Sequence, residues 1–239
     1  MESVKRRLIE LVRFHGVSIK QATAVPGLTL YRSDRPTAPV RSLYNPRVCV
    51  VLQWNKEIVI DREVIVVGPD DYLVVVLDLP VSARISQASA ASPHYALTLD
   101  LDPEVIADVA TDVSVSSAGE GMTKGVATSP LTIDILEPFE RLVRLLDRPS
   151  DIKTLAPLFQ RQLLSRLIQG GLGAMLLTTA QYTARLARVT STIGWINAHL
   201  HQPPHLAQLS VMDGLSDTTH HHPFNAATSI RTIQVSPSL

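Results

Sequence analysis

The feature that most constrains the fold is a change in the spacing of apolar residues partway along the chain. From Leu28 to Leu101 they come in short runs rich in valine and isoleucine, each of strand length and followed by a turn. From Ile133 onward they recur at three- and four-residue steps, the spacing of one face of a helix. The sequence therefore predicts an α+β fold, with β-structure first and helices after it.

The β-rich region predicts an antiparallel assembly of short strands. The runs that carry this prediction are VCVVLQ (48–53), EIVI (57–60), EVIVV (63–67), YLVVVL (72–77), ARISQA (83–88) and YALTLDL (95–101). Turn-forming residues such as GPDD (68–71) separate them. Strands at this spacing are typical of an antiparallel barrel or sandwich, and a small barrel commonly encloses space for one small ligand.

Helices are expected on both sides of these strands. Residues 4–14 place Leu8, Leu11 and Val12 among basic residues, a pattern that predicts a short amphipathic helix. Residues 110–130 are rich in serine, threonine and glycine and indicate a surface loop, whereas 133–146 and 155–168 have helical spacing. These two helices are candidates for a dimer surface, although an intrachain core explains them equally well.

Composition favours a folded protein of the cytoplasm. Hydrophobic residues make up 45% of the chain, and 22 basic residues balance 22 acidic ones, so net charge indicates no nucleic-acid or membrane partner. The single cysteine, Cys49, lies in an apolar run and suits a reducing compartment. We see no leader peptide at the N-terminus, and the apolar runs are too short to span a bilayer.

The β-rich region offers no catalytic arrangement. It contains one histidine, His94, which follows Pro93 and is expected in a loop rather than as a metal ligand. The pair Asp70 and Asp71 lies in a turn, where aspartate is favoured for its backbone hydrogen bonds. No nucleophile elbow or phosphate-binding loop is present in the sequence. We therefore expect a binding protein without cofactor or metal, and not an enzyme.

Near the C-terminus the residues have the outline of a helix-turn-helix. Leu206–Gly214 has a one-sided apolar stripe, Gly214 suits a left-handed turn, and Ser216 suits the N-cap of a second helix. Pro223, however, falls inside that second helix, where proline costs about 3 kcal/mol. No lysine or arginine occurs from Val189 to Ile230, so the usual phosphate-binding cations are missing.

Four longer stretches resemble one family. LTLYRSDRPTAPVRSLYNPRVCVVLQWNKEIVI (28–60), the segment 68–102 with LDLP, the segment 141–176 with LLDRP, and residues 187–229 are similar to transcriptional regulators of the AraC type. The resemblance covers roughly residues 20 to 230 and falls in the branch with its own N-terminal ligand domain. Trp54 and Asp71 stand where that family commonly has glycine.

The resemblance implies an order of domains. We expect an N-terminal helix (1–19), a β-rich cupin-like barrel for effector binding and dimerisation (20–130), a helical connector (131–180) and a partial helix-turn-helix region (181–239). Family members usually carry two helix-turn-helix units, so this chain looks truncated within or just after the first. Its expected partners are double-stranded DNA, a small-molecule effector and a second copy of itself.

The resemblance also assigns the DNA contacts. In the first unit the side chains expected to face DNA are Ser216, Thr218, Thr219, His221, His222, Asn225 and Thr228. His220 replaces an apolar residue of the family pattern, and Asn225 replaces a basic one. The run His220–His222 has a second interpretation as a metal site, but adjacent helical residues point in different directions. A third is charge, because histidines protonated below about pH 6.5 would supply cations.

Two functions from different classes remain open. The first is a cytoplasmic, dimeric transcription regulator that couples an effector-binding barrel to a DNA-binding element. The second is a ligand-binding or hetero-dimerisation module derived from such a regulator that does not bind DNA. The missing cations favour the second on physical grounds, and the resemblance favours the first.

Overall fold

The computed structural model describes residues 1–112 and 125–181. The chain divides into two units, Met1–Ala180 and Gln181–Leu239, and almost all of the second lies outside the described residues. The architecture below is therefore that of the first unit.

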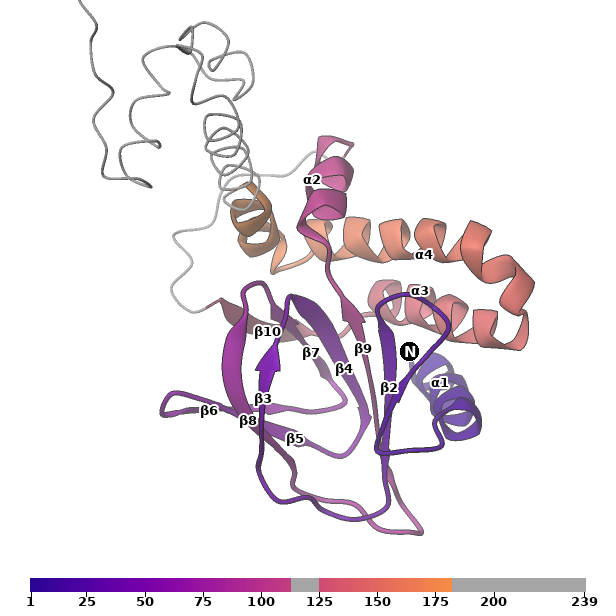
Figure 1. Cartoon of the computed structure of the whole chain (residues 1–239), viewed down its shortest axis with the longest axis vertical. Coiled ribbons are helices and arrows are strands. Elements are labelled where there is room, and N and C mark those ends of the chain that lie inside the picture. The colour runs from indigo at the N-terminus through magenta and orange to yellow at the C-terminus, as the bar shows by residue number, and fades with distance from the viewer. Residues whose placement is uncertain (113–124, 182–239) are drawn as a thin grey trace, which may run out of the picture. The chain divides into compact units, whose positions relative to one another are not determined.

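Ten strands of this unit form two antiparallel sheets (Figure 1). The larger sheet has the order β1 (Lys20–Ala22), β2 (Leu28–Ser33), β9 (His94–Asp100), β4 (Arg47–Gln53), β7 (Asp71–Val75) and β10 (Val126–Pro130). The smaller sheet has the order β3 (Val40–Tyr44), β8 (Leu79–Ile85), β5 (Lys56–Ile60) and β6 (Glu63–Val67).

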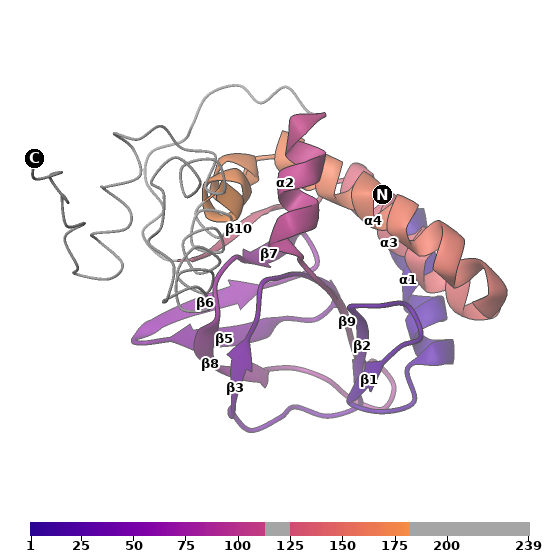
Figure 2. The same cartoon turned by 45° about the horizontal axis from the view of Figure 1, so that its top comes forward.

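Helices cover the outer face of the larger sheet. They are α1 (Glu2–His15), α3 (Ile133–Arg144) and α4 (Pro149–Gln169), with the short 3₁₀ turn η1 (Leu145–Asp147) between the last two. Helix α2 (Pro103–Thr111) packs on α4, and a further helix begins at residue 173. Figures 1 and 2 show α1, α3 and α4 together on one side of β2 and β9. The larger sheet thus lies between a helical layer and the smaller sheet.

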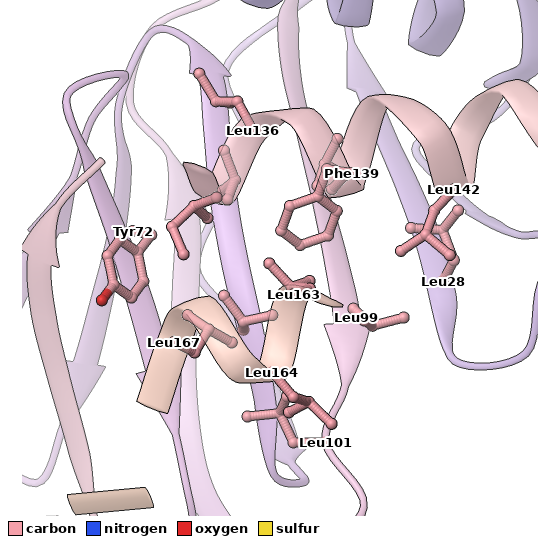
Figure 3. Close-up of a cluster of buried hydrophobic side chains, with 14 of the residues drawn as sticks. Leu28, Tyr72, Leu99, Leu101, Leu136, Phe139, Leu142, Leu163, Leu164 and Leu167 are labelled. Carbon is pink, nitrogen blue, oxygen red and sulfur yellow. The ribbon is translucent and has the colours of Figure 1, made fainter. Parts of the chain in front are cut away.

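The main hydrophobic core fills the space between the helices and the larger sheet. Figure 3 shows Phe139 of α3 and Leu163 of α4 among leucines of the strands, and both are fully buried. On α1 the buried residues Val4, Leu8 and Val12 recur at four-residue steps, which is why this segment forms an amphipathic helix. The apolar faces of α3 and α4 are thus used within the chain.

A second, smaller core lies between the two sheets. Strand residues alternate between faces, so β9 directs Tyr95, Leu97 and Leu99 to the helices and His94, Ala96 and Thr98 to the smaller sheet. Both faces of β9 are buried, which explains its nearly continuous apolar run. From the smaller sheet, Ile58, Val67 and Val81 contribute to this second core.

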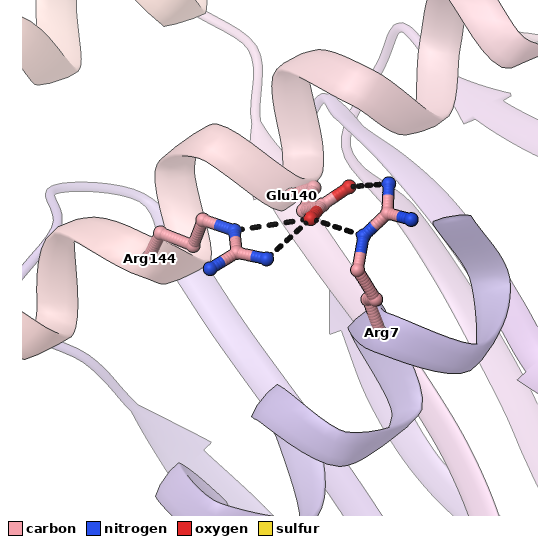
Figure 4. A network of polar contacts seen from close by, with 3 residues as sticks. All are labelled: Arg7, Glu140 and Arg144. Atoms are coloured by element: carbon pink, nitrogen blue, oxygen red, sulfur yellow. Dashed lines mark hydrogen bonds and ion pairs between the residues drawn. The ribbon is translucent and has the colours of Figure 1, made fainter. Parts of the chain in front are cut away.

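An ion-pair network joins the N-terminal helix to the connector (Figure 4). Arg7 of α1 donates two hydrogen bonds to the Glu140 carboxylate on α3, at 2.8 Å from Nε and 2.9 Å from Nη2. Arg144 donates to the same carboxylate at 2.8 Å. The Glu140 side chain is only 9% exposed, so two guanidinium groups compensate its charge in a partly desolvated position.

The predicted α+β fold is confirmed, and most predicted strands are present within a few residues. The loop predicted over 110–130 is partly wrong: residues 126–130 form β10, which pairs with β7. Residues 103–111 form α2, which was not predicted; Asp102 caps it by accepting a hydrogen bond from the Glu104 amide. The expected helix-turn-helix lies outside the described residues.

Candidate functional site

Five side chains with polar groups meet between the two sheets. Tyr31 of β2 and His94 and Thr98 of β9 come from the inner face of the larger sheet. Lys56 of β5 and Tyr44 of β3 come from the smaller sheet and lie in phase with its buried aliphatic residues. We call Tyr31, Tyr44, Lys56, His94 and Thr98 the inter-sheet polar cluster.

Lys56 is the cation of this cluster. Its Nζ lies 5.2 Å from the centre of the Tyr31 ring and 5.3 Å from that of Tyr44, within the range of cation–π attraction. Burial lowers the pKa of Lys56, but Cys49 and the two tyrosines outweigh it and leave the pKa raised, so the amine is charged at neutral pH. Within residues 1–112 and 125–181 no carboxylate forms an ion pair with it.

A second cation lies near the Tyr44 ring, but this one is paired. The Arg47 guanidinium is 5.2 Å from the Tyr44 ring centre, and its Nη2 is 3.4 Å from a carboxylate oxygen of Asp100. Arg47 is therefore a paired cation, whereas Lys56 contacts the rings of Tyr31 and Tyr44, has a side-chain hydrogen bond with Tyr44, and has no ion pair among the described side chains.

His94 is a neutral imidazole at the start of β9. It is 1% exposed, and its pKa is lowered to about 4, first by burial and then by the charge of Lys56, against a backbone hydrogen bond with Gln53. Its Nδ1 has no hydrogen-bond partner in the described part of the chain. The expectation that His94 is a loop residue is wrong, because pairing with Ser33 of β2 draws it into the sheet.

Thr98, in the middle of β9, also has a side-chain atom without a hydrogen-bond partner among the described residues. Its side chain is 2% exposed, and its Oγ1 lacks a well-formed hydrogen bond to any described residue. Its strand neighbours are Cys49 and Thr29. Tyr31 lies close by: burial raises the Tyr31 pKa, while the charge of Lys56 and the Thr98 hydroxyl partly offset that rise.

The turn between β4 and β5 holds the segment that precedes His94. Gln53 donates from Nε2 to the Pro93 carbonyl at 2.7 Å, and Trp54 donates from its indole N–H to the Ser92 carbonyl at 2.8 Å. Trp54 has φ 65°, in the left-handed region where glycine is favoured. The indole hydrogen bond is a compensating contact that glycine would not provide.

Cys49 lies beside the cluster but is unsuited to chemistry. It is 1% exposed, and burial raises the pKa of its thiol, although Lys56 and Arg47 oppose that shift. A buried thiol of raised pKa is a poor nucleophile. The cluster as a whole can bind an anion and exchange hydrogen bonds with it, and it contains no activated nucleophile with an adjacent base.

All of the DNA-contact residues expected from the sequence lie outside the described part of the chain: Ser216, Thr218, Thr219, His221, His222, Asn225 and Thr228. The histidine run at 220–222 lies there too. Among the described residues no set of three or more His, Cys, Asp or Glu is grouped to hold a metal ion. None of their helices has the length and hydropathy to cross a membrane.

Sequence reasoning missed the inter-sheet polar cluster, although one signal was available. In KEIVI, Lys56 alternates in phase with Ile58 and Ile60, so a lysine was expected on the same face as two large aliphatic residues. A charged residue at such a position is unusual in a strand with one buried face.

Comparison with known proteins identifies a family. Residues 24–175 match the description "AraC-type transcriptional regulator N-terminus". No curated protein matches the sequence significantly.

Similar solved structures include two regulators and a cupin. Apo ToxT from Vibrio cholerae is 7% identical, with a TM-score of 0.41 over 88% of this chain and 97% of its own. The AraC-like transcriptional activator CuxR is 12% identical, with a TM-score of 0.37 over 86% and 73%. A cupin protein from Bacteroides fragilis is 20% identical, with a TM-score of 0.24 over 42% and 81%. Since these scores are below 0.5, the family assignment rests on the match over residues 24–175.

Proposed function

Because this chain belongs to the AraC-type transcriptional regulators, through a match that spans residues 24–175, we propose that it senses a small molecule and regulates transcription. The family is regulatory and not enzymatic, in keeping with a site that has cations and hydrogen-bonding groups but no catalytic pair. The observation that carries the proposal is the inter-sheet polar cluster, a charged and incompletely hydrogen-bonded group inside the family's N-terminal domain.

The effector would bind between the two sheets. His94 and Thr98 provide side-chain atoms that lack partners among the described residues, and Tyr31 and Tyr44 provide aromatic faces. Lys56 provides a positive charge that has no ion-pair partner among those residues. Buried polar groups in native proteins nearly always have partners. A ligand that supplies those partners would therefore stabilise the folded domain, which is how a sensory domain registers its effector.

The output of the regulator would come from residues 181–239. In this proposal the helix-turn-helix formed there contacts double-stranded DNA through Ser216, Thr218, Thr219, His221, His222, Asn225 and Thr228. The sequence outline of helix, glycine turn and N-cap at Ser216 supports this assignment. The protein would act in the cytoplasm as a homodimer, as expected for this class of regulator.

A second function is favoured by one specific observation. No lysine or arginine occurs between Val189 and Ile230, and phosphate affinity is supplied largely by those residues. A chain that binds effector, or pairs with intact relatives, without contacting DNA would fit that composition. Such a protein would have the same effector-binding domain as the regulators and would not bind DNA.

Fluorescence anisotropy of labelled duplex DNA distinguishes the two functions. The full chain is titrated against random duplex and against the region upstream of its own gene, at 50 and 200 mM salt and at pH 6 and 7.5. The regulator predicts tighter binding to the upstream region, weakened at higher salt because bound cations release counterions. If histidines provide the cations, binding is stronger at pH 6, and the double change His221→Ala, His222→Ala removes that difference.

Absence of binding at both pH values would overturn the DNA-binding proposal and leave the second function. Equal affinity for both duplexes would show a chain that binds phosphates without reading sequence.

A further inference from the structure

The charge of Lys56 defines what the inter-sheet polar cluster can bind. Lys56 is half-buried, and an ammonium group withdrawn from water is normally paired with an anion, because desolvation of an isolated charge is costly. Here the described residues supply two tyrosine rings, at 5.2 and 5.3 Å, and no carboxylate. Cation–π contacts compensate only part of the lost hydration. An incoming anion would complete the pair.

The other groups of the cluster lie within the influence of that charge. Lys56 lowers the pKa of His94 and opposes the rise in the pKa of Tyr31, so both lie near its ammonium. Thr98 lies beside Cys49, which also responds to Lys56. The two unpartnered atoms, Nδ1 of His94 and Oγ1 of Thr98, are on residues 1% and 2% exposed. His94 and Thr98 are four residues apart on β9, about 13 Å along the strand, with Ala96 opposite Tyr31 between them. The two unused hydrogen-bonding groups therefore lie along β9 near the cation and not at one point.

The side chains that pack around this cluster between the sheets are apolar. The second core is lined there by aliphatic residues, on both sheets: Val51, Ile58, Val67, Leu73, Val75 and Val81. A fully hydrated polyanion would leave most of its charge against these side chains. A ligand with one charged end and a hydrocarbon body matches both parts of the interior.

We propose that the effector is a small organic monocarboxylate, with its carboxylate paired to Lys56 and its hydrocarbon part against the aliphatic residues between the sheets. The Thr98 hydroxyl donates to a carboxylate oxygen. This inference rests on the proposed sensory role of the domain and adds the chemical class of its effector.

The test compares ligands that differ only in charge. Isothermal titration of the full chain at pH 7.5 uses octanoate against octanamide and benzoate against benzamide. Each carboxylate should bind at one site per chain and about tenfold or more tighter than its amide, since a hydrogen-bonded ion pair is worth that much in a partly desolvated site.

A charge-removing variant then assigns the preference to Lys56. Lys56→Met should reduce octanoate binding to the level of octanamide and leave the amide unchanged, whereas Lys56→Arg should retain most of the preference. Lys153→Met, at an exposed position on α4, is the matched control and should behave as wild type. Thermal unfolding without ligand checks the fold, which should survive because an apolar replacement of a buried charge is often neutral or stabilising.

Three results would overturn the inference: amides that bind as tightly as carboxylates, a Lys56→Met variant that keeps the preference, or no binding of either carboxylate. Binding of the amides alone would point to a neutral effector and leave the sensory role in place. The regulatory role itself is judged by the DNA titration, so the two proposals fail through different measurements.

Discussion

At the scale of single residues, His94 shows how burial changes the pKa of a titratable side chain. The imidazole is enclosed by two sheets and faces the ammonium of Lys56, and both effects disfavour its protonated form. Its pKa is therefore about 4 in the folded protein, against an ordinary value of 6.5. The unfolded chain takes up this proton at a higher pH than the folded one, so acidification favours unfolding.

We predict that His94→Gln removes part of the acid sensitivity of the fold. As pH falls from 6.5 to 4, wild type should lose about 3 kcal/mol of unfolding free energy through His94 alone, at about 1.4 kcal/mol per pKa unit. The loss begins below the unfolded pKa and ends near the folded one. Urea denaturation at several pH values across that interval measures it, as the difference between the two proteins. If the unfolding free energies of the two proteins changed equally with pH over this interval, His94 would not be held neutral in the folded protein.

At the scale of elements, the attachment of α1 to α3 depends on one carboxylate. Glu140 accepts hydrogen bonds from Arg7 across the interface and from Arg144 within its own helix. The hydrogen bonds from Arg7 lower the Glu140 pKa, against burial, and Arg144 lowers it further. Because the folded pKa lies below the ordinary value, this contribution is complete at neutral pH and is lost as pH falls through the folded pKa.

We predict that Glu140→Gln lowers the unfolding free energy by about 2 kcal/mol at pH 7, within the range for buried charge-assisted hydrogen bonds. The deficit should be smaller at pH 3 than at pH 7, because this contribution is lost as pH falls toward the lowered pKa of Glu140. Urea denaturation at both pH values measures it. Glu137→Gln is the control on the same helix: its side chain is 46% exposed and lies 3.9 Å from Arg141, so its loss should be about 0.5 kcal/mol or less. Equal losses for the two variants would contradict a special role for Glu140.

At the scale of the whole molecule, the first unit contains both hydrophobic cores and both sheets. The helices α1, α3 and α4 close the outer face of the larger sheet, and every strand of the two sheets lies before Ala180. A unit with its own core folds independently as a rule.

We predict that residues 1–180 expressed alone unfold in one cooperative thermal transition, with a midpoint near that of the corresponding transition of the full chain. Circular dichroism at 222 nm measures this. The fragment should bind the same effectors as the full chain and no DNA, which calorimetry and anisotropy check in turn. A fragment without a cooperative transition would show that residues 181–239 complete the core.

The strands that could be predicted are those whose own residues and flanking turns favour an extended structure. The runs in β4, β6 and β9 are long and apolar, and their turns contain proline, glycine or aspartate, so their residues alone indicate an extended structure. The buried stripe of α1 could be read in the same way. In contrast, β10 has the composition of a loop and becomes a strand because it pairs with β7, with Val126 opposite Val75.

The sequence by itself determined the fold class, the succession of a β-rich region and a helical one, and the family, because apolar periodicity and motif resemblance are properties of neighbouring residues. Only the tertiary structure decided the site. Lys56 and Tyr44 on one sheet meet Tyr31, His94 and Thr98 on the other because the two sheets face each other. That arrangement depends on pairing between segments far apart in the chain. Because of this pairing, His94, which was expected in a loop, is a buried neutral imidazole in β9.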